Sequence, residues 1–385
     1  MNTKINVLQV IPKLGYGGAE TGCYDIAHFL SENDCGSFIA TSGGGLLKFI
    51  KKDKVKLFRL PVHSKNPILI LFNTLVLCIY IIIFKIDIIH ARSRAPAWSC
   101  YLASFLTRRV FVTTFHGTYN FKSNIKKFYN SIMLRAKLTI AGSNFIFSHI
   151  NENYSEYLNK EKKLRVIYRG INVDYYNSKN ISLLKKEKLK EEWNLSSNKF
   201  NILLPGRLTY WKGQEKFIES LNILIEDYSV TDFQAIILGS DQGRKVYKKK
   251  LINLVERYKL SKKVKFIPHC KEMPLAYSLS DVAVSASLEP EAFGRISVEA
   301  QSMGKPIIAS NIGGSKETVI NKKTGLLYKH DDPRELAKCL NTVIQLSPDE
   351  LKLMGNEGRK NVTKKFDVET MCQSNLKEYK RLIKN

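Results

Sequence analysis

Two cations follow a strand pattern in the second half of the chain. Residues 200–207 are mostly apolar, and the strand that they predict ends at Gly206 and Arg207, with Lys212 close behind. A guanidinium fork and an ammonium at the start of the next helix can converge on one pair of phosphates. A diphosphate leaving group requires such a pair, because negative charge builds on it as its bond breaks. We therefore expect Gly206, Arg207 and Lys212 to form a diphosphate site.

Two carboxylates form a second candidate site, after the strand pattern at 282–287. Glu291 lies in the loop that follows this strand, and Glu299 lies inside the helix that begins near Gly294. The free N–H groups at such a helix start suit anionic or hydroxyl-rich groups, and Glu299 can accept hydrogen bonds from a ribose diol. Pairs of glutamates are usually solvated, but the apolar residues beside Glu299 make that alternative less favoured.

A glycine-rich loop follows the first strand pattern, at 5–11. Its Gly17 and Gly18 allow backbone N–H groups to approach a ligand before a helix opens. A plain tight turn explains the same glycines. The loop lacks the full G-x-G-x-x-G spacing with an acidic partner about 20 residues on, so a dehydrogenase is disfavoured.

Short apolar runs alternate with amphipathic stretches along the whole chain. Such alternation predicts parallel sheets with right-handed helical crossovers, and hence two doubly wound, Rossmann-like α/β domains. We expect a first domain at 1–172, a polar linker at 173–199 and a second domain at 200–365. A C-terminal helix at 366–385 is expected to pack back on the first domain. Ligands of such sheets bind at the carboxyl ends of the strands, where the loops described above lie.

The composition indicates a protein with reduced thiols and a strongly basic surface. Seven cysteines without a C-x-x-C pair suggest neither a disulfide framework nor a zinc site, which fits the cytoplasm. The net charge of +26 would attract nucleic acid, anionic lipid or phosphorylated substrates, although a lysine-rich solvated surface explains it equally well. No nucleic-acid-binding motif accompanies the charge, so specific nucleic-acid binding is disfavoured.

The segment 67–84 is almost continuously apolar. Its length is borderline for a membrane span. Lys85 and Asp87 follow it directly, and 87–92 has the pattern of a buried strand. A helix packed between strands is therefore favoured over a span, with an outer edge that touches lipid.

These motifs together resemble glycosyltransferase family four (group 1), the retaining group with the GT-B fold, in which two Rossmann-like domains face a cleft. The spacing of Arg207 and Lys212 and of Glu291 and Glu299 carries most of the resemblance. It extends over nearly the whole chain through Gly17-Gly18-Ala19-Glu20, His116-Gly117, Tyr168-Arg169-Gly170-Ile171-Asn172 and Thr324-Gly325-Leu326-Leu327. Asn172 departs from the family pattern, which commonly has Asp there.

The resemblance implies a role for each matching residue. Arg207 and Lys212 would hold the donor diphosphate and stabilise it as it leaves. Glu299 would bind the nucleotide ribose, Glu291 would contact hydroxyl groups of the donor sugar, and His116 would position that sugar rather than act as a general base. Further donor contacts would come from the backbone of Gly17, Gly18, Phe293, Gly294 and Arg295.

The reaction so implied is transfer of a hexose-type sugar from a UDP- or GDP-sugar to a glycan or lipid-linked acceptor, with retention. No cofactor and no metal are expected: the chain has no Asp-x-Asp motif, and helix capping explains Asp331 and Asp332. Arg92 and Arg94 are candidate acceptor contacts. The resemblance to bacterial enzymes of lipopolysaccharide or other surface-glycan assembly suggests a cytoplasmic protein, peripheral to the anionic inner membrane.

Two other classes stay open at this point. A nucleotide-sugar 2-epimerase or a glycan phosphorylase shares the fold, but the first needs a different arrangement of carboxylates and the second a cofactor lysine signature that the sequence lacks. A basic, non-enzymatic nucleic-acid-binding protein is the other alternative.

Overall fold

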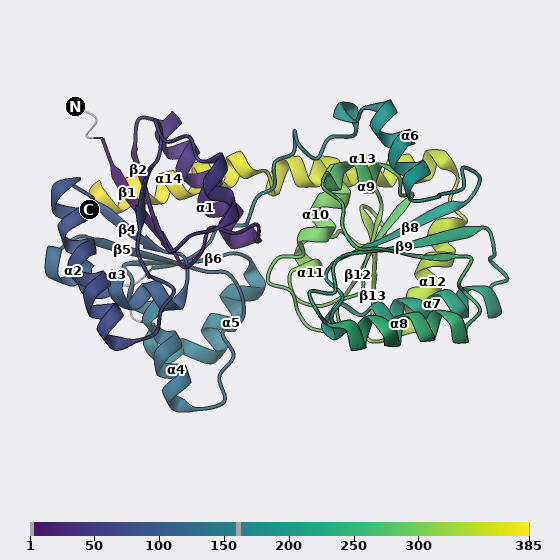
Figure 1. The fold of residues 1–385 in the computed structure, drawn as a ribbon, viewed down its shortest axis with the longest axis horizontal. Helices are drawn as coiled ribbons and strands as arrows, with labels where there is room; N and C mark the ends of the chain where they lie inside the picture. Colours follow the sequence, from purple (N-terminus) through teal and green to yellow (C-terminus); the bar gives the residue numbers. More distant parts are fainter. Residues whose placement is uncertain (1–3, 159–162, 385) are drawn as a thin grey trace. The chain divides into compact units, whose positions relative to one another are not determined.

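The chain folds into two compact units, each built around a parallel sheet with helices on both faces (Figure 1). The computed structural model describes residues 4–158 and 163–384. The first unit comprises Met1–Gly170 and Val368–Asn385, and the second comprises Ile171–Asp367. The segment 173–199, expected to be a linker, thus belongs to the second unit. The prediction of two doubly wound α/β domains is confirmed.

The first unit contains a seven-stranded parallel sheet with the order β3-β2-β1-β4-β5-β6-β7. Consecutive strands wind outward in both directions from β1 and β4, so the loops after these two strands flank the point where the winding reverses. Its strands are β1 (Asn6–Ile11), β2 (Gly36–Thr41), β3 (Lys56–Arg59), β4 (Ile88–Ala91), β5 (Val110–Phe115), β6 (Leu138–Ala141) and β7 (Lys163–Val166). Its helices are α1 (Gly18–Glu32), α2 (Pro67–Ile83), α3 (Arg94–Thr107), α4 (Asn124–Ser131), α5 (Asn144–Tyr154) and α14 (Val368–Lys384), with short 3-10 turns η1 (Gly45–Phe49), η2 (Ile132–Arg135) and η3 (Ser155–Tyr157).

The second unit repeats this plan with a six-stranded parallel sheet of order β10-β9-β8-β11-β12-β13. Here the winding reverses between β8 and β11, and the loops after these strands carry both sequence motifs of this half. Its strands are β8 (Phe200–Pro205), β9 (Phe233–Leu238), β10 (Val264–Ile267), β11 (Val282–Ser285), β12 (Ile307–Ser310) and β13 (Gly325–Tyr328). Its helices are α6 (Leu183–Glu192), α7 (Gln214–Glu226), α8 (Lys245–Arg257), α9 (Met273–Ser278), α10 (Arg295–Ser302), α11 (Ser315–Thr318), α12 (Pro333–Ile344) and α13 (Pro348–Lys365), with 3-10 turns η4 (Ser178–Asn180) and η5 (Tyr210–Lys212).

The C-terminal helix α14 is built into the core of the first unit. It packs on α1, and its Met371, Leu376 and Tyr379 are buried against residues of the sheet. The hydroxyl of Tyr379 lies 2.6 Å from Nδ1 of His90 on β4, whose Nε2 lies 2.7 Å from the hydroxyl of Thr114 on β5. Both nitrogens of this buried histidine therefore have partners, and they connect α14 to the centre of the sheet.

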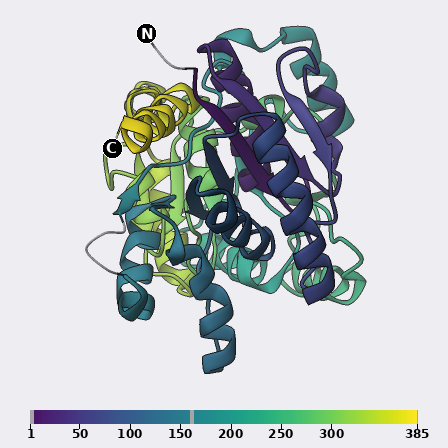
Figure 2. The same cartoon turned by 90° about the vertical axis from the view of Figure 1, so that its left-hand side faces the viewer.

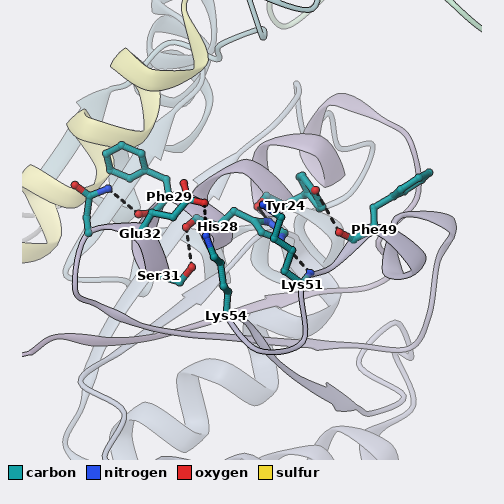
Figure 3. A network of polar contacts seen from close by, with 9 residues as sticks. Tyr24, His28, Phe29, Ser31, Glu32, Phe49, Lys51 and Lys54 are labelled. Atoms are coloured by element: carbon teal, nitrogen blue, oxygen red, sulfur yellow. Dashed lines mark hydrogen bonds and ion pairs between the residues drawn. The ribbon is translucent and has the colours of Figure 1, made fainter.

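Polar contacts fix helix α1 against the segment that follows η1 (Figure 3). The hydroxyl of Tyr24 donates to the carbonyl of Phe49, and the backbone N–H of Lys51 donates to Nε2 of His28 at 3.3 Å. At the end of the helix, Lys54 pairs with Glu32 at 2.8 Å. These contacts hold the helix whose first turn lies at the carboxyl end of β1.

The apolar segment at 67–84 forms helix α2, which packs against α3 (Figure 2). Its N-cap is Asn66, whose side chain accepts a hydrogen bond from the N–H of Ile68, and Pro67 occupies the first turn, where a missing N–H costs nothing. Over residues 4–158 and 163–384, the structure shows no helix with the length and apolar character needed to cross a membrane.

Helices α10 and α13 approach closely at two glycines. A Cβ atom on Gly355 of α13 would lie 1.9 Å from the carbonyl oxygen of Gly304, which follows α10. Glycine in a helix interior usually costs about 1 kcal/mol relative to alanine. Gly355→Ala is nevertheless expected to destabilise the second unit by about 2 kcal/mol, because the added methyl group overpacks this contact. The matched change Asn356→Ala, at the next and exposed position, is expected to raise the melting temperature. Differential scanning calorimetry of both variants checks this, and a Gly355→Ala variant more stable than the parent would contradict the packing.

The buried His90 makes the stability of the first unit dependent on pH. Burial, and then the nearby charge of Arg92, hold its pKa well below the ordinary 6.5. The unfolded chain therefore binds a proton that the folded chain does not, and stability falls as the pH drops below about 6.5. His90→Gln is expected to flatten this slope by up to about 1.4 kcal/mol per pH unit, whereas His63→Gln, at an exposed position, leaves it unchanged. Hydrogen exchange of the β4 and β5 amides between pH 7.5 and 5.5 measures this pH dependence of stability. The same pH dependence in His90→Gln as in the parent would count against a neutral histidine at this position.

Candidate active site

An ion pair joins the two sequence motifs of the second unit. Nζ of Lys212 lies 2.7 Å from Oε1 of Glu291, and the two side chains are only 11% and 15% exposed. The same oxygen accepts a hydrogen bond from the hydroxyl of Ser287, near the start of the loop after β11. An ammonium has three donors, so Lys212 retains the capacity to bind a phosphate oxygen while it holds Glu291.

Backbone contacts keep the two loops together. Gly213 has φ +70°, and a Cβ there would lie 1.9 Å from the carbonyl oxygen of Ala286. Next to it, the N–H of Leu288 donates to the carbonyl of Trp211 at 2.8 Å. Only glycine permits both this φ and this approach. Gly213 thus brings Lys212 beside Glu291 and also caps the start of α7.

Arg207 lies at the exposed edge of the same site. Its carbonyl accepts a hydrogen bond from the buried side chain of Gln214 at 2.9 Å, which fixes the backbone. Its guanidinium carbon lies 5.9 Å from the ring centre of Trp211, and Nζ of Lys212 lies 4.4 Å from the same ring. Gly206, with φ +148°, lies under the Lys212 side chain, since a Cβ there would be 3.6 Å from Cδ of that lysine. The predicted cations therefore gather around one indole ring.

Glu299 is buried, and each of its carboxylate oxygens accepts a hydrogen bond within the second unit. Its Oε1 accepts from Nε of Arg295 at 2.6 Å, and its Oε2 accepts from the hydroxyl of Tyr277 at 2.9 Å. Tyr176 stacks edge-on against Tyr277, and burial followed by the charge of Glu299 raises the pKa of both phenols. Burial lowers and the Glu299 charge raises the pKa of Arg295, with a net increase. Glu299 is thus a rigid, negatively charged acceptor one turn inside α10.

The start of helix α10 is supported by a second pair of glycines. Gly294, with φ +79°, precedes the helix, and Phe293 is buried against Phe366. The N–H of Gly314 donates to the carbonyl of Glu291 at 2.8 Å, and a Cβ on Gly313 would lie 2.6 Å from that same oxygen. The first N–H groups of an α-helix lack partners within the helix, so this start presents donors beside Glu291.

In the first unit, the glycine loop and a histidine lie at the carboxyl edge of the sheet. Gly17 is the N-cap of α1, and the carboxylate of Glu20 lies directly over it, since a Cβ on Gly17 would be 2.4 Å from Oε2 of that residue. Gly18 is the first residue of the helix. His116 follows β5, and its carbonyl accepts a hydrogen bond from Nη2 of Arg169 at 2.6 Å.

The imidazole of His116 is neutral, and its two nitrogens can form hydrogen bonds with a ligand. Both ring nitrogens are shielded from solvent and neither has a hydrogen-bond partner among the described residues. Burial, with the charges of Arg169 and Arg92, holds its pKa well below 6.5. A buried polar group without a partner costs free energy unless a ligand satisfies it. The ring can therefore donate one hydrogen bond and accept another from a bound hydroxyl group.

The two arginines after β4 differ. Arg92 is 4% exposed, forms no ion pair among the residues that the structure describes, and has an Nε without a partner. Arg94 instead donates to the side chain of Asn130 at 2.8 Å and lies 4.2 Å from the ring centre of Tyr119. Arg94 is thus held inside the first unit, whereas Arg92 keeps an uncompensated charge.

The structure therefore brings the predicted residues together in two groups. The second unit unites Gly206, Arg207, Lys212, Glu291, Phe293, Gly294, Arg295 and Glu299. The first unit gathers Gly17, Gly18, Arg92 and His116 at one sheet edge. Sequence reasoning missed Ser287, Tyr176, Tyr277, Gly313 and Gly314. The Gly-Gly pair directly after a strand pattern was a signal for two of these, but the tyrosines are brought in by tertiary packing alone.

Comparison with known proteins agrees with this geometry. Residues 185–361 match the family model described as glycosyl transferases group 1, and residues 16–175 match that of glycosyltransferase family 4. A solved glycosyltransferase from Rickettsia africae is 37% identical over all of both chains, with a TM-score of 0.91. The HepE protein of Anabaena, solved with UDP-glucose, is 24% identical over 98% of this chain and all of its own, with a TM-score of 0.81.

A capsular polysaccharide biosynthesis glycosyltransferase, CapM of Staphylococcus aureus, is 28% identical over 51% of this chain and 52% of its own. Both halves of the chain thus match models of one enzyme family, and a relative well above 30% identity covers the whole chain. The alternatives of a different enzyme class and of a non-enzymatic nucleic-acid-binding protein are set aside by these matches. The chain belongs to the group 1 (family 4) glycosyltransferases and has their GT-B fold.

Proposed function

We propose that this glycosyltransferase moves a hexose-type sugar from a UDP- or GDP-sugar to a glycan or lipid-linked acceptor of surface-polysaccharide assembly, with lipopolysaccharide as one candidate product. The observation that carries the proposal is the cation pair of Arg207 and Lys212 beside Glu291. Two cations suit a diphosphate, and the carboxylate beside them suits sugar hydroxyls. UDP-sugars are the first donors to test, because HepE was solved with UDP-glucose.

We assign residues of the site to each part of the nucleotide sugar: its phosphates, its ribose and its sugar. Arg207 and Lys212 bind the two phosphates, with the first N–H groups of α10 and the glycine loop of the first unit as further donors. Glu299 accepts from the ribose hydroxyls, and Arg295 and Tyr277 hold its carboxylate in place. Glu291 accepts from sugar hydroxyls through Oε2, since its Oε1 is occupied by Lys212 and Ser287.

The proposed reaction retains the configuration of the anomeric carbon. The acceptor hydroxyl attacks that carbon from the face that the diphosphate leaves. The bond from carbon to acceptor oxygen forms as the bond to phosphate oxygen breaks, and the acceptor proton passes to the departing phosphate oxygen. His116 positions the sugar through its neutral imidazole, which fits a low pKa and does not require it to take a proton.

Metal independence is part of the proposal. The adjacent aspartates have other roles, because Asp332 caps α12 by accepting from the N–H groups of Arg334 and Glu335, and Asp331 lies 3.5 Å from Nζ of Lys216. Arg207 and Lys212 would then supply the positive charge that a divalent ion supplies in other enzymes.

On the acceptor side, we assign Arg92 to an anionic group of the acceptor. Its buried and unpaired guanidinium would be stabilised by a phosphate or carboxylate. Such acceptors include lipid-linked phosphates, which would place the enzyme in the cytoplasm at the inner face of a membrane.

Removal of the Arg207 guanidinium tests the leaving-group site. Arg207→Ala is expected to lower kcat by about 10²–10³-fold, because charge on the departing diphosphate loses a donor. Arg334→Ala, which removes an exposed arginine paired with Asp227, serves as the control and should behave as the parent. The measurement is release of UDP or GDP from a panel of nucleotide sugars. Parent-like turnover in Arg207→Ala would remove the residue from the site.

Neutralising Glu299 tests the ribose contact. Because Glu299 also holds Arg295 and Tyr277, Glu299→Gln is preferred to a truncation that would leave both groups unpaired. We expect a roughly tenfold rise in KM for the donor with a smaller change in kcat, since ribose contacts exist before and during bond breaking. Glu256→Gln, on the exposed face of α8, is the control. A lowered kcat at unchanged KM would instead place Glu299 at the reacting bond.

A further inference from the structure

Helix α2 of the first unit exposes a stripe of apolar side chains and buries polar ones, which is the opposite of an ordinary helix at the surface of a domain. Its buried face includes Asn73 and Thr74, whose side chains donate to the carbonyls of Pro61 at 3.2 Å and Ile70 at 2.8 Å. Its solvent face is aliphatic and aromatic along the whole helix: Ile68, Leu71, Phe72, Leu75, Ile79 and Ile82 are between 50% and 77% exposed. Helical spacing puts these side chains on one stripe. Water is a poor environment for such a stripe, so it indicates an apolar contact surface.

The stripe continues onto the neighbouring helices. The end of α3, which packs on α2, exposes Phe105 at 73% and Leu106 at 62%. Lys65, just before α2, lies 5.8 Å from the ring of Tyr129 on α4, so α4 also lies close to the start of α2. Figure 2 shows α2 and α3 side by side on the face turned to the viewer. We call the stripe of α2 with the exposed end of α3 the α2–α3 face.

The part of the chain that forms the α2–α3 face is rich in cations and poor in acidic residues. From Lys54 to Asn151 the chain has fourteen lysines and arginines and one acidic residue, Asp87. This quarter of the chain therefore carries a net +13, half of the +26 of the whole. At the end of α3, a hollow of about 330 Å³ is lined by four of these cations. They are Arg108, Arg109, Arg135 and Lys137.

From these observations we infer that the α2–α3 face docks on the surface of an anionic lipid bilayer. The aliphatic stripe enters the interface between headgroups and acyl chains, and the surrounding cations meet the lipid phosphates. The hollow at the end of α3 receives a headgroup, because it combines cations with the apolar Phe105. A second protein copy would offer the same positive charge to this face, which disfavours self-association.

Helix α2 lies along the bilayer rather than across it. Its 17 residues give about 26 Å of helix, less than the roughly 30 Å of a hydrocarbon core. Its inner face is committed to α3 and to the polar contacts of Asn73 and Thr74. Docking on lipid would bring the enzyme to a lipid-linked acceptor, and this part of the inference rests on the proposed function. Binding to lipid itself stands on the α2–α3 face alone.

Flotation of the full chain with vesicles tests the docking. We expect binding to vesicles of phosphatidylcholine with phosphatidylglycerol, and much weaker binding to phosphatidylcholine alone. Leu75→Glu/Ile79→Glu should reduce the partition coefficient by at least about tenfold, because two exposed apolar side chains become anionic. The matched control is Leu183→Glu/Leu184→Glu, a change at two similarly exposed leucines of α6 in the second unit. Arg108→Gln/Lys137→Gln should weaken binding to anionic vesicles about fivefold per cation, and less at high salt.

Several results would overturn the inference. Parent-like flotation of Leu75→Glu/Ile79→Glu, or equal loss in the α6 control, would separate lipid binding from the α2–α3 face. A parent chain that ignores anionic vesicles but forms a dimer that Leu75→Glu/Ile79→Glu dissociates would assign the face to a second copy. Calorimetric binding of UDP-glucose, measured on the same samples, distinguishes the two proposals, because it reports the donor site and should be unchanged in the α2 variant.

Discussion

The candidate site of the second unit depends on one close backbone contact, between Gly213 and Ala286. The glycine has φ +70° and leaves no space for a Cβ, so the loop after β8 can lie directly on the loop after β11. These strands are neighbours at the point where the sheet winding reverses. The contact between their loops places the ammonium of Lys212 2.7 Å from the carboxylate of Glu291. Arg207, Trp211 and the start of α10 are then arranged around this pair.

The two units differ in whether the polar groups at their sheet edges are paired. In the second unit the charges of the candidate site are paired: Lys212 with Glu291, and Arg295 with Glu299. In the first unit the corresponding sheet edge holds two groups that have no partner within residues 4–158 and 163–384, the neutral ring of His116 and the charge of Arg92. Paired charges keep a rigid geometry, while unpaired polar groups gain most from a ligand. The division fits a pre-formed donor site and a first unit that is completed by what it binds.

The sequence allowed much of the fold to be predicted, because parallel strands and amphipathic helices have distinct periods. Residues 200–207 and 282–287 were each predicted as strands, with ligand-binding loops at their carboxyl ends. The structure makes these strands neighbours, and the loops after them carry the pair of Lys212 and Glu291. The tail was expected to be helical, with a separate C-terminal helix at 366–385, and the structure has a break at Phe366, whose carbonyl pairs with the N–H of Ile171. That break separates α13 of the second unit from α14 of the first.

Side-chain partners that come from distant segments of the chain could not be predicted from the sequence. The Glu299 carboxylate was expected to be open to a ribose, yet Tyr277 and Arg295 already hold it. Arg92 and Arg94 are close in sequence and looked equivalent, but only Arg94 finds a partner in Asn130. An outer edge of α2 in contact with lipid was expected, but the residues that form its exposed face were not predicted, because an apolar segment does not reveal which of its faces is covered. In each case the outcome depends on packing between elements far apart in the chain.

We propose that Arg207 and Lys212 form the diphosphate site of a nucleotide-sugar donor. Isothermal titration calorimetry with UDP, GDP, ADP and their sugar conjugates, in the presence of a metal chelator, tests it most directly. We expect saturable binding of one nucleotide family without metal, and loss of this binding in Arg207→Ala. Absence of binding for every nucleotide, or equal binding by the parent and Arg207→Ala, would contradict it.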